Sequence, residues 1–220
     1  MAGRGLAVHS GPPAGVVSCL FRCCEQETHE KEANEKEAQV ARRCVFLDRD
    51  GVINASVERD GRLVAPTSLA DFRIFSGVDA AIRSLRHGGF LVIVVTNQPD
   101  VATGLVKQET VEAMHTILRD CLAVDDIRVC YHVDRDECTC RKPKPGMLLD
   151  AARCHDIDLA NSYLVGDRWR DILAGDAAGC FTILVTGGDN ELSSTPGMVV
   201  NSLSSAAEFI LGRECQGVRS

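Results

Sequence analysis

Two carboxylates stand two residues apart in the stretch Asp48-Arg49-Asp50-Gly51, directly after an apolar run. Side chains at positions i and i+2 of an extended segment point to the same side, so Asp48 and Asp50 could face one pocket. Two like charges in that arrangement require a cation, and Mg²⁺ suits them because it binds oxygen ligands and bridges carboxylates to phosphate oxygens. Taken alone, the same residues fit an exposed turn equally well, since Asp and Gly are common in turns.

Three further stretches place complementary groups after apolar runs. Thr96 and Asn97 offer a hydroxyl and an amide that could hydrogen-bond a phosphoryl group. Lys142, next to Arg141, could neutralise phosphate charge, and Asp167 could be a third oxygen ligand of the ion. Each stretch has an ordinary alternative as a cap, a turn or a solvated surface. Together, in the order acid, hydroxyl, base and acid, the four stretches favour a catalytic site.

A cluster of soft metal ligands lies between the third apolar run and the basic pair. Within eleven residues it contains Cys130, His132, Cys138 and Cys140. Three thiolates and one imidazole make a complete tetrahedral zinc set, and a site with four protein ligands is structural because no position stays open for a substrate. The alternative is that the thiols are incidental. We favour zinc, which would fix the direction of the basic residues that follow the loop.

The apolar pattern predicts the elements that position these groups. Runs rich in Val, Ile and Leu without strict alternation are typical of strands covered on both faces. The expected strands are Cys44–Leu47, Phe90–Thr96, Ile127–His132, Tyr163–Val165, Phe181–Val185 and the shorter Met198–Val200. Helical periodicity lies between or after them, at Val78–Arg86, Gln108–Leu122, Gly146–His155, Arg170–Ala178 and Leu203–Leu211. The alternation predicts an α/β domain with a doubly wound parallel sheet, in which ligands bind beyond the carboxyl ends of the strands.

The composition limits the class of protein. The chain has 220 residues, of which 45% are hydrophobic and 25% charged, as in ordinary soluble globular proteins. A net charge of -7 gives no long-range attraction for nucleic acid or anionic lipid, so we expect neither as a partner. The eleven cysteines are scattered, which indicates a reducing compartment. No apolar run reaches the roughly 18 residues that span a bilayer, and we expect a cytoplasmic protein without a membrane partner.

The chain is predicted to hold one domain between two tails. The domain is expected at residues 42–213, after an N-terminal tail at 1–41 that is flexible or partly helical and before a short C-terminal tail at 214–220. Three cysteines of the first tail are interpreted as incidental and not as a metal or lipid site: Cys19, Cys23 and Cys24.

The four stretches resemble one known family. The order Asp-x-Asp-Gly-Val, Thr-Asn-Gln, Arg-Lys-Pro and Gly-Asp-x-x-x-Asp is similar to that of the haloacid dehalogenase superfamily of phosphatases, and the resemblance covers roughly residues 43–211. It implies that Asp48 is a nucleophile that forms an aspartyl-phosphate, and that Asp50 is the general acid and base. Thr96 and Lys142 would steady the phosphoryl group. Magnesium would be held by Asp48, the backbone carbonyl of Asp50, and Asp167.

The cysteine loop resembles two capless groups within that superfamily, the D-glycero-D-manno-heptose 1,7-bisphosphate phosphatases and the histidinol-phosphate phosphatases. The five-residue gap between His132 and Cys138 is like the second group. The stretches 99–104 and 143–149 look more like the first, although that group usually has Arg where Thr103 stands. We favour the heptose group, with histidinol phosphate as the alternative.

The resemblance to the heptose group also suggests substrate contacts. By that similarity Arg141 and Arg168 would bind the substrate, a small phosphorylated metabolite, at its second phosphate, which suits the bidentate geometry of Arg. Asp171 would steady its loop from outside the site. We expect a monomer or a weak homodimer. The alternative of another class is a binding module that keeps the fold without catalysis, although the complete acid set argues against it.

Overall fold

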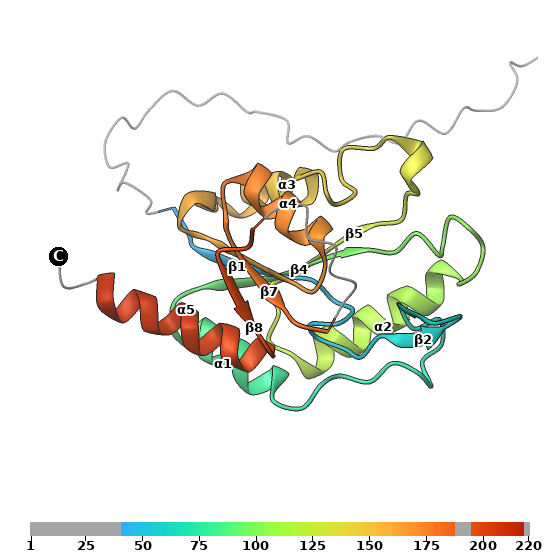
Figure 1. Ribbon diagram of the computed structural model, residues 1–220, viewed down its shortest axis with the longest axis horizontal. Helices are drawn as coiled ribbons and strands as arrows, with labels where there is room; N and C mark the ends of the chain where they lie inside the picture. The colour runs from blue at the N-terminus through green and yellow to red at the C-terminus, as the bar shows by residue number, and fades with distance from the viewer. Residues whose placement is uncertain (1–40, 188–194, 218–220) are drawn as a thin grey trace, which may run out of the picture. The chain divides into compact units, whose positions relative to one another are not determined.

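The protein was studied as a computed structural model that describes residues 41–187 and 195–217. At its centre is a six-stranded sheet in which every neighbouring pair is parallel, in the order β5-β4-β1-β6-β7-β8 (Figure 1). The strands are β1 (Cys44–Leu47), β4 (Leu91–Asn97), β5 (Asp126–Cys130), β6 (Tyr163–Gly166), β7 (Phe181–Val185) and β8 (Met198–Val200). From β1 the chain first builds outward through β4 and β5 and then crosses to β6, so the order reverses at β1. This confirms the predicted doubly wound sheet.

Helices cover both faces of the sheet (Figure 1). They are α1 (Val78–His87), α2 (Gln108–Cys121), α3 (Gly146–His155), α4 (Trp169–Ala178) and α5 (Leu203–Gly217). Alternate residues of β1 enter different cores: Val45 and Leu47 pack with α1, α2 and α5, whereas Cys44 and Phe46 pack with α3 and α4. Both faces of the strand are therefore apolar, which is why its sequence shows no alternation.

A small hairpin after β1 was not predicted. Within residues 54–66, β2 (Val57–Arg59) and β3 (Arg62–Val64) form an antiparallel pair. The two turn residues both have positive φ, 52° at Asp60 and 73° at Gly61. An Asp-Gly pair between short β-forming runs is a known hairpin pattern, so the sequence did contain the information.

Several element boundaries differ from the prediction by one or two residues, and helix α5 extends to Gly217 where its end was predicted at Leu211. Strand β5 ends at Cys130 and not at His132, because the chain then turns and brings the His132 ring back to 3.5 Å from the Cys130 sulfur. Helix α4 begins one residue earlier than expected, at Trp169, where the Asp171 carboxylate accepts the backbone N–H of Arg168 and caps the first turn.

The three cysteines of the N-terminal tail lie outside the described residues, and the domain limits stay a prediction.

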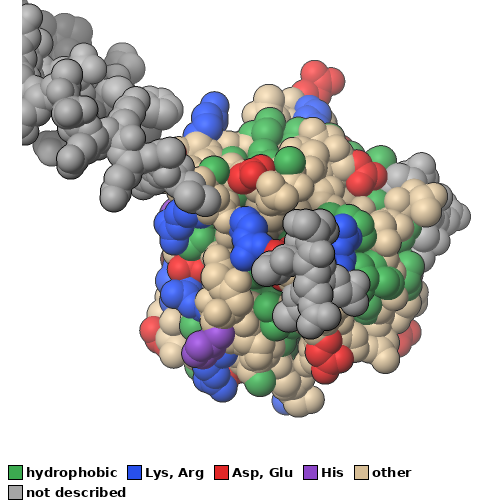
Figure 2. Space-filling model, turned by 90° about the vertical axis from the view of Figure 1, so that its left-hand side faces the viewer, with side chains coloured by type: hydrophobic (Ala, Val, Ile, Leu, Met, Phe, Trp, Pro, Cys, Tyr) green, Lys and Arg blue, Asp and Glu red, His purple; other side chains and the backbone are tan. Residues whose placement is uncertain are grey.

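No helix in the described ranges is both long and apolar enough to cross a bilayer. On the face drawn in Figure 2, basic, acidic and apolar side chains are interspersed over the described surface.

Candidate active site

The carboxyl ends of β1, β4 and β6 meet at one edge of the sheet, as expected for parallel strands. The backbone N–H of Asp48 donates to the carbonyl of Val165, which ties the end of β1 to the end of β6. A cavity of about 280 Å³ opens at this edge. Its charged and amide lining comes from Asp48, Asp50, Asn97, Asp100, Arg141, Lys142, Arg168, Arg170 and Asp171. The cavity therefore lies at the point where the strand order reverses.

Lys142 is the central cation of the site. Its buried ammonium donates to Asp48 Oδ1 at 2.7 Å, contacts Asp171 Oδ1 at 2.5 Å and donates to the carbonyl of Val95 at 2.8 Å. Burial lowers the pKa of Lys142, but the two carboxylates outweigh burial and raise the pKa well above its usual value. Asn97 accepts from the Lys142 backbone N–H at 3.1 Å and donates to its carbonyl at 3.0 Å. Asn97 thus holds the backbone of Lys142 in place.

Three carboxylates could hold a cation beside Lys142. Asp48, Asp167 and Asp171 each place a carboxylate oxygen within 4.8 Å of the others. Oδ1 of Asp167 is buried and has no hydrogen-bond partner among the described residues. Burial, followed by repulsion from Asp48 and Asp171, raises the pKa of Asp167 to about 8. An oxygen-rich set in which burial disfavours the charged form of Asp167 fits Mg²⁺.

Glycine is required beside this carboxylate set. Gly51 has φ +92°, and a Cβ on it would lie 2.2 Å from Oδ2 of Asp167. The turn after β1 can therefore approach Asp167 only because residue 51 has no side chain. Asp171 was predicted only to steady its loop. It does cap α4, but it also contributes an oxygen to the carboxylate set.

Asp50 lies in a network that the sequence did not reveal. Its Oδ2 accepts from Gln98 Nε2 at 2.8 Å, and Gln98 also donates to the Thr96 hydroxyl at 2.8 Å. Its Oδ1 accepts from Asn54 at 2.9 Å and from the guanidinium of Arg49. Thr96 is buried at the end of β4 and keeps its own O–H free to donate to a ligand. Gln98 and Arg49 were not selected because neither residue type suggests proton transfer.

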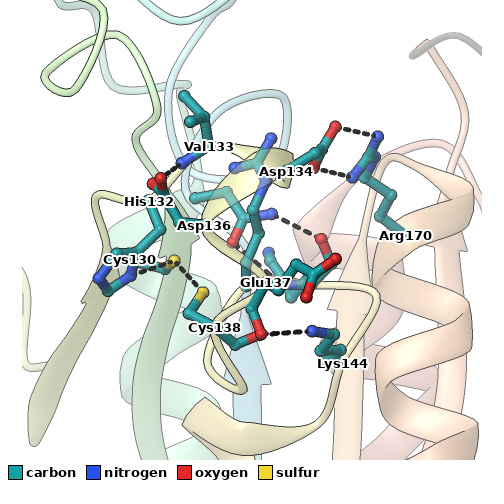
Figure 3. Close-up of polar contacts among 12 residues, drawn as sticks. Cys130, His132, Val133, Asp134, Asp136, Glu137, Cys138, Lys144 and Arg170 are labelled. Carbon is teal, nitrogen blue, oxygen red and sulfur yellow. Dashed lines mark hydrogen bonds and ion pairs between the residues drawn. The ribbon is translucent and has the colours of Figure 1, made fainter.

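The predicted zinc ligands converge on one point. The Cys140 sulfur lies 3.3 Å from the Cys130 sulfur and 3.4 Å from the Cys138 sulfur, and 3.3 Å from His132 Nδ1. Tetrahedral zinc with bonds of about 2.3 Å needs sulfurs roughly 3.8 Å apart, so the cluster needs only a slight expansion to hold the ion. Figure 3 shows Cys130, His132 and Cys138 side by side at the base of the loop. The donor set and its geometry fit a closed zinc site.

Three guanidinium groups line the cavity. Arg141 and Arg168 were predicted to contact substrate, and the structure adds Arg170 at the start of α4. Asp134, in the loop between the zinc ligands, accepts from Arg141 at 2.7 Å and from Arg170 at 3.1 Å (Figure 3). Arg168 donates to the carbonyl of Leu63 at 2.7 Å and so fastens the hairpin to this side of the cavity.

Known proteins are similar to this chain in sequence. A HAD-hydrolase-like family model matches residues 139–206. The D-glycero-beta-D-manno-heptose-1,7-bisphosphate 7-phosphatase of Bordetella bronchiseptica is 36% identical over 178 residues, which is 76% of this chain and 97% of that protein. The enzyme of the same name from Rhodopseudomonas palustris is 38% identical over 63% of this chain and 80% of its own. The chain belongs to the heptose-bisphosphate phosphatase family of HAD-like hydrolases.

Solved structures of similar phosphatases share the fold. The crystal structure of the B. bronchiseptica enzyme, complexed with magnesium and phosphate, matches with a TM-score of 0.68 at 34% identity and covers 78% of this chain and 99% of that one. A putative HAD-like phosphatase from Mesorhizobium loti matches with a TM-score of 0.61 at 31% identity, over 78% of this chain and 85% of that one. The predicted superfamily is therefore confirmed, whereas the individual residue roles stay predictions.

Proposed function

We propose that this protein is a magnesium-dependent phosphatase that removes the 7-phosphate of D-glycero-D-manno-heptose 1,7-bisphosphate through an aspartyl-phosphate on Asp48. The observation that carries the proposal is the position of Asp48: a buried carboxylate, 2.7 Å from the ammonium of Lys142, in a cavity lined by three guanidinium groups. The family relatives support the same substrate class, since they are named for it.

In the first step an oxygen of Asp48 attacks phosphorus and the bond from phosphorus to the sugar oxygen breaks. Asp50 gives its proton to the departing oxygen, which leaves as the sugar hydroxyl. Lys142 offsets the charge on the phosphoryl oxygens, and the Thr96 hydroxyl donates to one of them. Lys142 serves this role well because the Val95 carbonyl and Asn97 fix its position.

In the second step a water molecule attacks the same phosphorus. Asp50, now a carboxylate, takes a proton from that water, and the bond between phosphorus and the Asp48 oxygen breaks. Inorganic phosphate leaves, the Asp48 carboxylate is restored and Asp50 is again protonated. A carboxylate nucleophile thus splits one difficult displacement into two easier ones.

Magnesium and zinc would have different roles. Asp48, Asp167 and the backbone of Asp50 would hold Mg²⁺, with Asp171 close enough to contribute. When bound, Mg²⁺ neutralises phosphoryl charge and aligns the reacting oxygens. Zinc on the four-residue cluster would be mechanical, because the loop that it closes carries Asp134 and ends at Arg141.

The charges around the cavity favour a second phosphate over an amine. Nη1 of Arg141 is buried without a hydrogen-bond partner among the described residues, so its N–H groups can donate to an anionic ligand. Arg168 and Arg170 add two further cations to the same cavity. A bisphosphate satisfies these groups through charge-assisted hydrogen bonds. Histidinol phosphate carries an ammonium group, which these cations repel.

The test compares the bisphosphate with heptose 7-phosphate, which lacks the second phosphate, and with histidinol phosphate, the alternative substrate. With magnesium present, we expect heptose 1,7-bisphosphate to exceed both heptose 7-phosphate and histidinol phosphate by about a hundredfold in kcat/KM, roughly 2.7 kcal/mol of discrimination. The product should keep its phosphate at C1. Equal kcat/KM values for heptose 7-phosphate and the bisphosphate would contradict a second-phosphate site. A preference for histidinol phosphate would make it the proposed substrate in place of the heptose bisphosphate. If no phosphate were released from any phosphomonoester, the proposed phosphatase activity would be wrong.

A further inference from the structure

A fully buried arginine stands between the nucleophile and the general acid in the sequence. Arg49 has no exposed surface, although arginine is among the residues least often buried without a partner. Its Nε and Nη2 lie 3.2 and 3.0 Å from Oδ1 of Asp50, and its Cζ lies 5.7 Å from the ring centre of Phe72. Burying a guanidinium costs free energy, because the charge loses its hydration. Its presence beside a carboxylate that must transfer protons therefore suggests a role in the reaction.

The far side of this guanidinium is held by a histidine of α2. Nη1 of Arg49 lies 3.2 Å from Nε2 of His115, which is also fully buried. A guanidinium can only donate, so Nε2 must accept, and the ring proton must be on Nδ1. Burial, and then the charge of Arg49, lowers the pKa of His115 to about 4, so the ring is neutral at working pH. Nδ1 lies 3.7 Å from a carboxylate oxygen of Glu112.

We propose that His115 and Arg49 are positioning residues for proton transfer: His115 fixes the Arg49 guanidinium, and Arg49 fixes the carboxyl of Asp50. The proposal rests on the phosphatase mechanism above and assigns to it a residue on α2 that touches neither the phosphoryl group nor the carboxylate set. Arg49 would also stabilise the carboxylate that remains once Asp50 has given its proton to the leaving oxygen.

The hydrogen bonds also select the oxygen that carries the proton. Oδ1 of Asp50 accepts three N–H groups, two from Arg49 and one from Asn54. Oδ2 accepts one hydrogen bond, from Gln98, although Nη2 of Arg49 is also 3.0 Å away. Oδ1 therefore has no free lone pair, and Oδ2 is the atom that binds and releases the proton.

The reaction itself offers a readout that separates positioning from general damage. Departure of a sugar alkoxide needs a proton, whereas departure of p-nitrophenolate does not. Displacement from p-nitrophenyl phosphate is therefore insensitive to the acid, and only the later hydrolysis of the aspartyl-phosphate needs Asp50 as a base. A variant with a misplaced Asp50 should release the first p-nitrophenolate at a normal rate and then stall.

The experiment uses two variants of one histidine. In His115→Gln the amide oxygen can replace Nε2 as acceptor, whereas His115→Met keeps a similar volume without an acceptor. For His115→Met we expect kcat on the sugar bisphosphate to fall about tenfold or more. KM and the first-turnover rate on p-nitrophenyl phosphate should both stay within about twofold. His115→Gln should recover most of the lost kcat. Arg49→Lys keeps the positive charge but cannot hold the Asp50 carboxyl with two N–H groups, so it should lose kcat on the sugar bisphosphate and keep the first-turnover rate on p-nitrophenyl phosphate, as His115→Met does.

Thermal melting first establishes that each variant is folded. Equal losses of the first-turnover rate on both substrates, or a wild-type kcat in His115→Met and Arg49→Lys, would overturn the positioning role. So would a His115→Gln variant as slow as His115→Met. Failure of the phosphatase proposal looks different, because the wild-type protein would then release no phosphate from either substrate, and both proposals would fall before any variant was compared.

Discussion

Asp134 and Arg170 join the loop of the cysteine cluster to the first turn of α4 by two hydrogen bonds, of 3.1 and 3.3 Å. The same carboxylate accepts from Arg141 at 2.7 Å. The hydrogen bonds of these two arginines hold the pKa of Asp134 at about 2, so it is charged throughout the working range. Two cations of the cavity are thus oriented by one residue of the loop.

Asp134→Asn should therefore weaken binding of the second phosphate. We expect KM for the bisphosphate to rise about tenfold with kcat nearly unchanged. The contact of the arginines with the second phosphate is the same in the bound substrate and in the transition state, so weakening it affects binding and not the chemical step. Kinetics on p-nitrophenyl phosphate, which has no second phosphate, should not change. Asp136→Asn is the matched control in the same loop, since the Asp136 carboxylate accepts from the Val133 backbone and not from an arginine. A rise in KM on both substrates would indicate loop damage.

Loss of a zinc ligand should loosen the same loop. Metal analysis of the purified protein should give about one zinc per chain, and Cys138→Ser should remove most of it and lower Tm. KM for the bisphosphate should rise, because Asp134 and Arg141 lose their support. Cys121→Ser, at an exposed cysteine of α2, is the control and should keep both zinc and Tm. Full zinc content in the Cys138 variant would exclude the proposed ligand set.

The sequence predicted what local patterns determine. The central strands β1, β4 and β6 were recognisable because both of their faces are buried and most of their residues are apolar. The convergence of Asp48, Lys142 and Asp167 followed from the rule that parallel strands end at one edge. The β2–β3 hairpin was missed, although Asp60 and Gly61 form a recognisable turn pair.

Pairings between distant segments could not be predicted. Arg49 and His115 are 66 residues apart, and Asp134 and Arg170 are 36 apart. Each of these residues has an ordinary local explanation as part of a turn, a core helix or a solvated surface. Only the packing of α2 and α4 against the sheet brings the partners together, and no periodicity or spacing encodes those contacts.

Asp48→Asn should abolish turnover and keep the fold. We expect kcat to fall by about four orders of magnitude or more, because an amide cannot form the aspartyl-phosphate. Lys142 keeps its contact with Asp171, so the buried ammonium still has a counter-charge. Asp79→Asn, on the exposed side of α1, is the control for the same chemical change. Residual activity above about 1% of wild type would contradict the covalent route.

Magnesium should stabilise the protein more strongly at higher pH. The pKa of Asp167 is raised to about 8, first by burial, whereas an unfolded aspartate titrates near 3.9. Between these values the folded, metal-free protein holds a proton that the unfolded chain has released, so its free energy of unfolding decreases as pH rises. His115, with its pKa lowered to about 4, is neutral in the folded protein in this range. Its unfolded imidazole titrates near 6.5 and adds a smaller change of the opposite sign.

We therefore expect a decrease in stability on the order of 1–2 kcal/mol between pH 6.5 and 8 in EDTA. Because Mg²⁺ binds the ionised carboxylates, it should offset this decrease, and the Tm shift that it causes should be larger at pH 8 than at pH 6.5. Thermal denaturation at both pH values, with EDTA or with saturating magnesium, measures this. Asp167→Asn removes the titrating group and should flatten the pH dependence in EDTA. Equal magnesium shifts at pH 6.5 and pH 8 would show that the carboxylate set is already ionised without the metal and would contradict the prediction.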